Sequence, residues 1–202
     1  IAAKNGKQSK WLMINTTPTE KVPWDKVHYK LIDPKDVDKF FNPDYTAAAK
    51  IDGALGLLNT LRDKIRVLSY RTYKETGYPI VHTQRLGLGA GEIAKLPKEL
   101  QDLIILGEIY GVRKGKAIPA AELGGLLNAT IANSLRKQSE KGTRLKMMLF
   151  DIANAPKEMT RPERIRLLKK LVKKLNPDVF EVVEEAKTPE EIRELYDKII
   201  RG

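Results

Sequence analysis

The chain has 202 residues, with 37 Lys or Arg against 26 Asp or Glu, which gives a formal charge of +11 at pH 7. It has no cysteine, which excludes disulfides, thiolate metal sites and cysteine nucleophiles. Its hydrophobic content of 42% argues against disorder, and no apolar run is long enough for a membrane helix. The positive charge favours a polyanionic partner such as nucleic acid.

Residues 1–42 are polar and punctuated by prolines, which predicts an irregular segment with one short helix near 34–41. The regular apolar patterns lie in residues 43–202. We therefore expect one domain over 43–202, with residues 1–42 as an amino-terminal extension or the edge of that domain.

Apolar runs of strand length predict a sheet. Residues 54–61 and 65–70 flank a short charged stretch, which is typical of a β-hairpin. Continuous apolar runs predict further strands at 103–112 and 145–152, and a short one at 179–183.

Helical patterns lie between and after these strands. Apolar residues at a spacing of four predict one helix over 120–136 that packs on the sheet. Thr160 and Glu163 have the spacing of a capping box and predict a helix that stops at Asn176-Pro177.

The capping pattern recurs near the end of the sequence. Thr188 and Glu191 form a second box, with Pro189 at the first helical position. Together the elements predict an α+β fold built on an antiparallel sheet with helices at its faces.

The sequence Lys50-Ile51-Asp52-Gly53 stands just before the first strand of the expected hairpin. One interpretation is a solvated turn between a loop and a strand. The other is a lysine whose amine attacks phosphorus, because desolvation or a nearby cation lowers the pKa of such an amine and the Asp52 carboxylate orients it. The position of the motif is compatible with both.

Three further motifs follow in order on expected strands: Ser69-Tyr70-Arg71, Leu106-Gly107-Glu108-Ile109 and Leu149-Phe150-Asp151-Ile152. A helix with Pro, Arg and paired leucines comes next, at 161–168. With the lysine motif, this series resembles the nucleotidyltransferase (adenylation) domain of ATP-dependent DNA ligases. The superfamily also contains RNA ligases and messenger-RNA capping guanylyltransferases, and the resemblance spans about residues 45–202.

The resemblance implies a role for each motif. Lys50 would become covalently linked to AMP, and Arg71 would help to hold nucleotide or phosphate. Glu108 would lie near the ribose hydroxyls and the metal, and Phe150 would stack on adenine. The implied cofactors are ATP and Mg²⁺, and the implied fold is the ATP-grasp-like nucleotidyltransferase fold. The implied nucleotide-binding set is Asp52, Gly53, Arg71, Glu108 and Phe150.

Each of these residues also has a plain structural interpretation. Phe150 on an apolar strand is typical of a core residue. Glu108 could be an outward-facing strand residue, although a carboxylate within an apolar run is costly to bury without a partner. Arg71 could be an ordinary exposed arginine at a strand end.

Two positions depart from the family pattern. Leu55 stands where the first motif usually has arginine, and Ala48 stands where the family often has a glutamate that reads the adenine amino group. Arg62, Arg66 or Arg85 could supply the missing charge. The family's later motifs would follow residue 202, so we expect the domain to be incomplete at its carboxyl end and this piece alone to seal nicks feebly or not at all.

The expected reaction passes AMP from Lys50 to the 5′-phosphate of nicked duplex DNA, after which a 3′-hydroxyl displaces the AMP. An RNA ligase or a capping guanylyltransferase is an alternative with the same chemistry, and a non-catalytic basic nucleic-acid-binding module is an alternative of another class. We expect nicked DNA and ATP as partners, no membrane, a monomer, and a location at the nucleoid in the cytoplasm or, in a eukaryote, in the nucleus.

Basic residues gather in clusters that favour sequence-independent contacts with phosphates or, in the simpler interpretation, form solvated faces. These clusters are residues 113–116, 136–146 and 161–174. The glycines of 87–91 have the composition of a phosphate-binding loop, but a connector is the simpler interpretation. His28 and His82 stand far apart in the sequence without cysteine partners, so we expect no metal site there.

Overall fold

The computed structural model describes residues 11–15, 34–61, 64–72, 77–89 and 96–201. The chain divides into two compact units. The central unit is Asp52–Val182, and the terminal unit combines Ile1–Ile51 with Val183–Gly202. Within the described part, no helix is long and apolar enough to cross a membrane.

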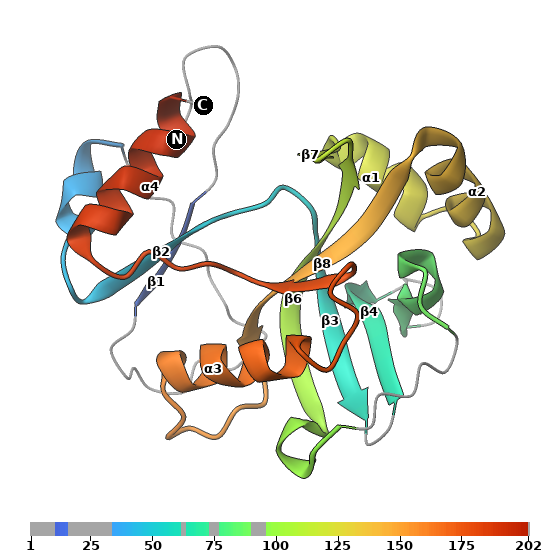
Figure 1. Cartoon of the computed structure of the whole chain (residues 1–202), viewed down its shortest axis with the longest axis horizontal. Coiled ribbons are helices and arrows are strands. Elements are labelled where there is room, and N and C mark those ends of the chain that lie inside the picture. Colours follow the sequence, from blue (N-terminus) through green and yellow to red (C-terminus); the bar gives the residue numbers. More distant parts are fainter. Residues whose placement is uncertain (1–10, 16–33, 62–63, 73–76, 90–95, 202) are drawn as a thin grey trace. The chain divides into compact units, whose positions relative to one another are not determined.

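The central unit is built on one sheet with the strand order β5-β4-β3-β6-β8-β9, and β7 pairs with β6 (Figure 1). Its strands are β3 (Ala54–Leu61), β4 (Lys64–Thr72), β5 (Pro79–Val81), β6 (Leu103–Arg113), β7 (Lys116–Ala117), β8 (Thr143–Ile152) and β9 (Phe180–Val182). The hairpin and the strands expected near 103–112, 145–152 and 179–183 are thereby confirmed. The α+β class is confirmed as well, with a mostly antiparallel sheet.

One pair of strands departs from the expected antiparallel arrangement, because β8 and β9 are parallel. The chain between them forms helix α3 (Arg161–Val172), which contacts both strands. A crossover of this length is what parallel neighbours require. The sheet is therefore antiparallel except at this edge.

The centre of the sheet has a buried face formed by cross-strand partners. Leu58 of β3 lies opposite Ile105 of β6 and Val67 of β4, and all three side chains are fully buried. Residues directly opposite each other in an antiparallel pair point to the same face. This face carries much of the core of the central unit.

The single helix expected over 120–136 is wrong. The structure has two helices there, α1 (Ala120–Leu127) and α2 (Ile131–Lys141), which contact each other and pack against β6 and β8, respectively (Figure 1). Thr130 starts the second helix, since its side chain accepts a hydrogen bond from the Asn133 amide. The break ends the apolar stripe: Leu123 and Leu127 are buried, whereas Ile131 and Leu135 are exposed.

The capping box expected for α3 is confirmed. The Thr160 amide and hydroxyl both donate to Oε2 of Glu163, at 2.7 and 2.8 Å. Ile165, Leu168 and Leu171 form the buried side of the helix. Two short 3₁₀ helices, η3 (Thr83–Leu86) and η4 (Lys98–Leu100), complete the central unit.

The terminal unit contains a two-stranded antiparallel sheet of β1 (Trp11–Asn15) and β2 (Tyr45–Ala49). It also contains the 3₁₀ helix η2 (Pro34–Phe40), close to the expected short helix, and α4 (Pro189–Arg201). The expectation of an otherwise irregular segment before residue 43 is wrong at 11–15. The small residues of β2 carry a weak strand signal, yet Ala47 and Ala48 are buried.

Helix α4 belongs with β2. Ala47 and Ala186 exchange two backbone hydrogen bonds of 3.0 and 2.8 Å, and α4 then packs against β2. The second capping box is confirmed, because the Glu191 amide donates to the Thr188 hydroxyl and the Glu191 carboxylate accepts from the Thr188 amide. Residues from both segments of the terminal unit thus form one packed body.

Candidate functional site

Gly53 lies directly against the middle of β6. A Cβ atom at this position would be 2.3 Å from the carbonyl oxygen of Ile109 and 2.8 Å from Cγ of Glu108. Real Cβ atoms do not approach other atoms this closely, so only glycine fits. The glycine of the first motif and the glutamate of the third motif are therefore in van der Waals contact.

Glu108 is partly buried in β6. It lies opposite Leu55 of β3 on one side and Met148 of β8 on the other, and Met148 in turn lies beside Glu181 of β9. Leu55 and Met148 are partly buried too. The structure thus places the Glu108 carboxylate in a half-buried row across the sheet rather than on a fully solvated face.

Phe150 is partly buried at an irregularity of β8. The pairing passes from Leu106 with Asp151 to Gly107 with Leu149, so Phe150 is the extra residue of a bulge. Helix α3 fixes this bulge through two arginines. Nη1 of Arg161 donates a hydrogen bond to the Phe150 carbonyl and forms an ion pair with Asp151 at 3.3 Å. Nε of Arg164 donates a hydrogen bond to Asp151 at 2.6 Å.

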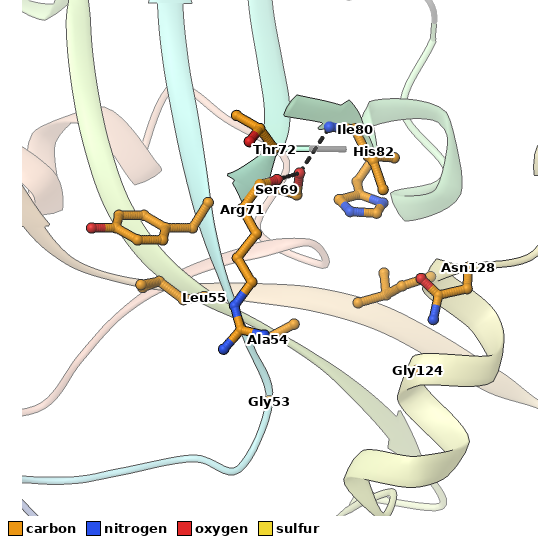
Figure 2. A pocket seen from close by; sticks show the side chains of 12 residues that line it. Gly53, Ala54, Leu55, Ser69, Arg71, Thr72, Ile80, His82, Gly124 and Asn128 are labelled. Atoms are coloured by element: carbon orange, nitrogen blue, oxygen red, sulfur yellow. Dashed lines mark hydrogen bonds between the residues drawn. The ribbon is translucent and has the colours of Figure 1, made fainter. Parts of the chain in front are cut away.

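A cleft of about 790 Å³ opens where β3 begins and β4 ends (Figure 2). Its described lining residues are Gly53, Ala54, Leu55, Ser69, Tyr70, Arg71, Thr72, Ile80, His82, Gly124, Leu127 and Asn128. Figure 2 shows the Arg71 side chain reaching along the cleft toward Ala54. Gly53 and Arg71, two of the expected nucleotide-binding residues, therefore line the same cleft.

Ser69 fixes the end of β4 beside Arg71. Its hydroxyl donates to the Arg71 carbonyl at 2.6 Å and accepts from the Ile80 amide at 2.8 Å (Figure 2). This pair of bonds ties β4 to β5 where the strand register shifts between Leu68 and Thr72. Arg71 itself is exposed at the mouth of the cleft.

His82 is the buried polar residue of the cleft lining, with 4% of its surface exposed. Burial and the nearby Arg85 charge lower the pKa of His82 from 6.5 to about 4, so the imidazole is neutral at pH 7. Arg85 donates to the carbonyl oxygens of Ala129 and Val81. His82 is not among the site residues expected from the sequence, because an isolated histidine carries no motif that would reveal it.

Lys50 follows β2 in the terminal unit and is partly buried, with Nζ donating to the Ile51 carbonyl at 3.3 Å. The other expected site residues belong to the central unit, where Asp52 is exposed. Gly53 contacts Glu108 and shares the cleft with Arg71. Within the central unit, Gly53 therefore lies both beside Glu108 and in the cleft that Arg71 lines, where β3 begins.

Mg²⁺ is compatible with this donor set. No group of three or more His, Cys, Asp or Glu side chains gathers as a metal cluster among the residues that the structure describes. Mg²⁺ on phosphate substrates needs only one or two carboxylates, because phosphate oxygens and water complete its octahedron. The half-buried Glu108 carboxylate beside Gly53 meets that requirement.

The glycine-rich stretch is described only as far as residue 89. Gly87 has a φ of 74° and ends η3, which is the ordinary use of a left-handed glycine. His28 and Arg62 lie outside the described residues. No protein-family model matches the chain, and no curated protein sequence matches it.

Proposed function

We propose that this chain carries the adenylation chemistry of an ATP-dependent DNA ligase. The Lys50 amine loses a proton and attacks the α-phosphorus of ATP, which forms a P–N bond and expels pyrophosphate. A 5′-phosphate at a nick then takes the AMP and frees the lysine. Attack by the adjacent 3′-hydroxyl forms the phosphodiester and releases AMP.

The observation that carries this proposal is the contact of Gly53 with Glu108 and Ile109. Gly53 stands three residues after Lys50, and Glu108 is the carboxylate that the resemblance assigns to ribose and metal. Nucleotidyl transfer asks a protein mainly to position the reactants and to neutralise charge. The close packing fixes Gly53 itself against the strand that carries the Glu108 carboxylate.

Arg71 and Phe150 support the proposal in different ways. Arg71 offers an exposed guanidinium at the mouth of the cleft, suited to a phosphate. Phe150 stands in a bulge that α3 fixes through Arg161, and bulges are common beside functional sites. Each residue has the chemistry that its assigned role needs.

The test is covalent labelling with ATP carrying a radioactive α-phosphate, in the presence of Mg²⁺. The expected result is a labelled protein band that acid removes and base does not, as a phosphoramidate requires. Lys50→Ala should abolish the band, whereas Lys64→Ala, at an exposed lysine that begins β4, should leave it. A protein without label, or a label that survives Lys50→Ala, contradicts the proposal.

Two further arms separate the alternatives with the same chemistry. Labelled GTP in place of ATP tests a guanylyltransferase. Nicked duplex DNA and nicked duplex RNA, added to the labelled protein, show which strand end removes the label. We expect ATP and DNA to be preferred.

A further inference from the structure

The chain passes between its two units twice. The first crossing lies between residues 51 and 52, and the second lies between residues 182 and 183. Residues 50–53 and 183–185 belong to no helix or strand. A domain hinge usually consists of a few such residues at the ends of regular elements, because they absorb changes in φ and ψ without breaking a hydrogen-bonded ladder. Both crossings therefore have the backbone that a hinge requires.

The first crossing ends at a fixed point on β6. The backbone of Gly53 packs against Glu108 and Ile109 so closely that no Cβ atom fits at position 53. The next residue, Ala54, already pairs with Ile109 in the sheet. The chain is thus held from Gly53 onward, and any turn at this crossing has to be taken up before that residue.

The second crossing begins just after Glu181 of β9, a strand of only three residues that pairs with β8. The Glu181 carboxylate fastens this short strand by accepting hydrogen bonds from the Tyr110 hydroxyl and, at 3.0 Å, from Nζ of Lys146. Burial and the bond to Glu181 raise the pKa of Tyr110, so the phenol keeps the proton that it donates. Hydrogen bonds to a charged acceptor are among the strong ones in proteins, and these two hold β9 on the sheet.

The two fixed points lie at one level of the sheet. Leu55 of β3, Glu108 of β6, Met148 of β8 and Glu181 of β9 are successive cross-strand partners. One crossing enters just before Leu55, and the other leaves just after Glu181. Two pivots set apart on one rigid sheet define a single axis across its strands, because a turn about any other axis would stretch one of the two connections.

The two segments of the terminal unit are fastened to each other beyond the crossings. Ala47 and Ala186 exchange backbone hydrogen bonds of 3.0 and 2.8 Å. The Arg193 guanidinium carbon lies 4.5 Å from the ring centroid of Phe41, and the ring centroids of Phe41 and Tyr196 are 5.9 Å apart. A cation over an aromatic ring is attractive, so these contacts join the segment before the first crossing to the segment after the second.

We propose that residues 51–52 and 183–185 form a two-point hinge about which the terminal unit turns as one body relative to the central unit. The axis passes through the pivots at Gly53 and Glu181. Hinge motions of this kind take microseconds to milliseconds. Lys50 directly precedes the first crossing and moves with the terminal unit. The inference concerns the fold alone and does not depend on adenylation.

Distances between pairs of spin labels, measured by pulsed electron resonance on the frozen full chain, test the hinge. The sequence has no cysteine, so introduced cysteines are the only labelling sites. Ser139→Cys in α2 with Glu194→Cys in α4 places one label in each unit, and Ser139→Cys with Lys170→Cys in α3 places both in the central unit. All three residues are exposed. We expect the inter-unit distances to be distributed about twice as broadly as the intra-unit ones, and equal widths overturn the proposal.

Two variants test the pivot at β9. Glu181→Gln removes its charge, and Tyr110→Phe is the milder change, which removes only the phenolic donor. Each should broaden the inter-unit distribution about 1.5-fold and leave the intra-unit one unchanged. Glu122→Gln is the matched control, because Glu122 also pairs with two cations, Arg113 and Lys141, but belongs to α1, which neither crossing enters. Inter-unit widths that change in neither pivot variant, or that change equally in the control, overturn the proposal.

Covalent labelling of the same proteins separates this inference from the adenylation chemistry. Normal lysyl-AMP formation together with equal inter-unit and intra-unit widths would leave the ligase proposal intact and remove the hinge. Broad inter-unit distances that respond to the pivot variants, in a protein that never takes the label, would do the reverse.

Discussion

At the scale of single residues, the tightest constraint in the described structure near the expected motifs is the contact between Gly53 and β6. A strand-end glycine is usually explained by backbone freedom, but here the reason is space. The loop that begins with Asp52 runs so close to Ile109 that any side chain at position 53 would push the loop and β6 apart.

Gly53→Ala should therefore destabilise the central unit. Forcing a methyl group into a filled space costs typically about 1–3 kcal/mol. Urea unfolding measures the loss, and Gly89→Ala is the control, because a Cβ at Gly89 meets nothing within 4 Å. Equal midpoints for the two variants would show that the loop yields without cost.

The site could be predicted from the sequence only in part. Residue types and the order of motifs single out Glu108 and Arg71, because a carboxylate inside an apolar run and a motif arginine are visible in the letters. The contact of Gly53 with Glu108 depends on the register of β3 against β6, which no local pattern specifies. The Nδ1 atom of His82 is buried without a hydrogen-bond partner among the described residues, which only the packed structure reveals.

At the scale of elements, the two capping boxes stand in different units. Thr160 and Glu163 begin α3 in the central unit, and Thr188 and Glu191 begin α4 in the terminal unit. A backbone hydrogen bond from Thr160 lowers the pKa of Glu163, and one from Lys187 lowers the pKa of Glu191. Each capping box stabilises the first turn of its own helix, so its loss should affect that helix alone.

Thr160→Ala and Thr188→Ala should each cost about 1 kcal/mol of helix stability. Hydrogen exchange should speed up in the first turns of α3 for the former and of α4 for the latter. A change spread evenly over both helices by either variant would contradict the division into two units.

The boxes also predict the direction of a pH effect. Both carboxyls have a lowered pKa in the folded protein. Their contribution to the stability of the fold is therefore complete above the ordinary pKa of 4.5 and declines as the pH falls below that value. Glu163→Gln should reduce the loss of stability in this window, as unfolding measured at several pH values would show. An unchanged pH dependence would argue against the Glu163 contact.

Elements with strong local patterns could be predicted, and those that depend on tertiary contacts could not. The hairpin and both capped helices carry periodic apolar residues or caps. Strand β2 is built of small residues and is a strand because of its partners β1 and Ala186. The apolar residues spaced four apart continue through the break between α1 and α2, so they do not reveal it. Position 133 is not Glu or Gln, so Thr130 shows no capping box that would mark the start of a second helix.

At the scale of the whole molecule, part of the net charge of +11 lies on exposed lysines of α3. Its buried side faces the sheet, and four lysines lie exposed on or just after the helix without an ion pair to any described residue. These are Lys169, Lys170, Lys173 and Lys174. Unpaired lysines in this number suit contact with a phosphate backbone.

Binding to duplex DNA should therefore weaken steeply with salt. Lys173→Gln should flatten the slope of log affinity against log salt by about 0.9 if Lys173 contacts one phosphate. Lys39→Gln is the control, because Asp36 already pairs with Lys39 at 2.6 Å. Anisotropy titrations at several NaCl concentrations measure both slopes. Identical slopes for the two variants would show that Lys173 of the α3 lysine group does not contact DNA.

The two-segment build of the terminal unit has a consequence for synthesis on the ribosome. Strand β2, which leads into Lys50, receives its Ala186 partner and helix α4 only after the whole of Asp52–Val182 has been translated. At ordinary elongation rates this delay is on the order of ten seconds. The central unit can thus fold first, and the segment that bears the proposed nucleophile acquires its neighbours last. A chain that ends after Val182 should therefore form the cleft of the central unit but lack the Ala186 and α4 contacts of the segment that leads into Lys50.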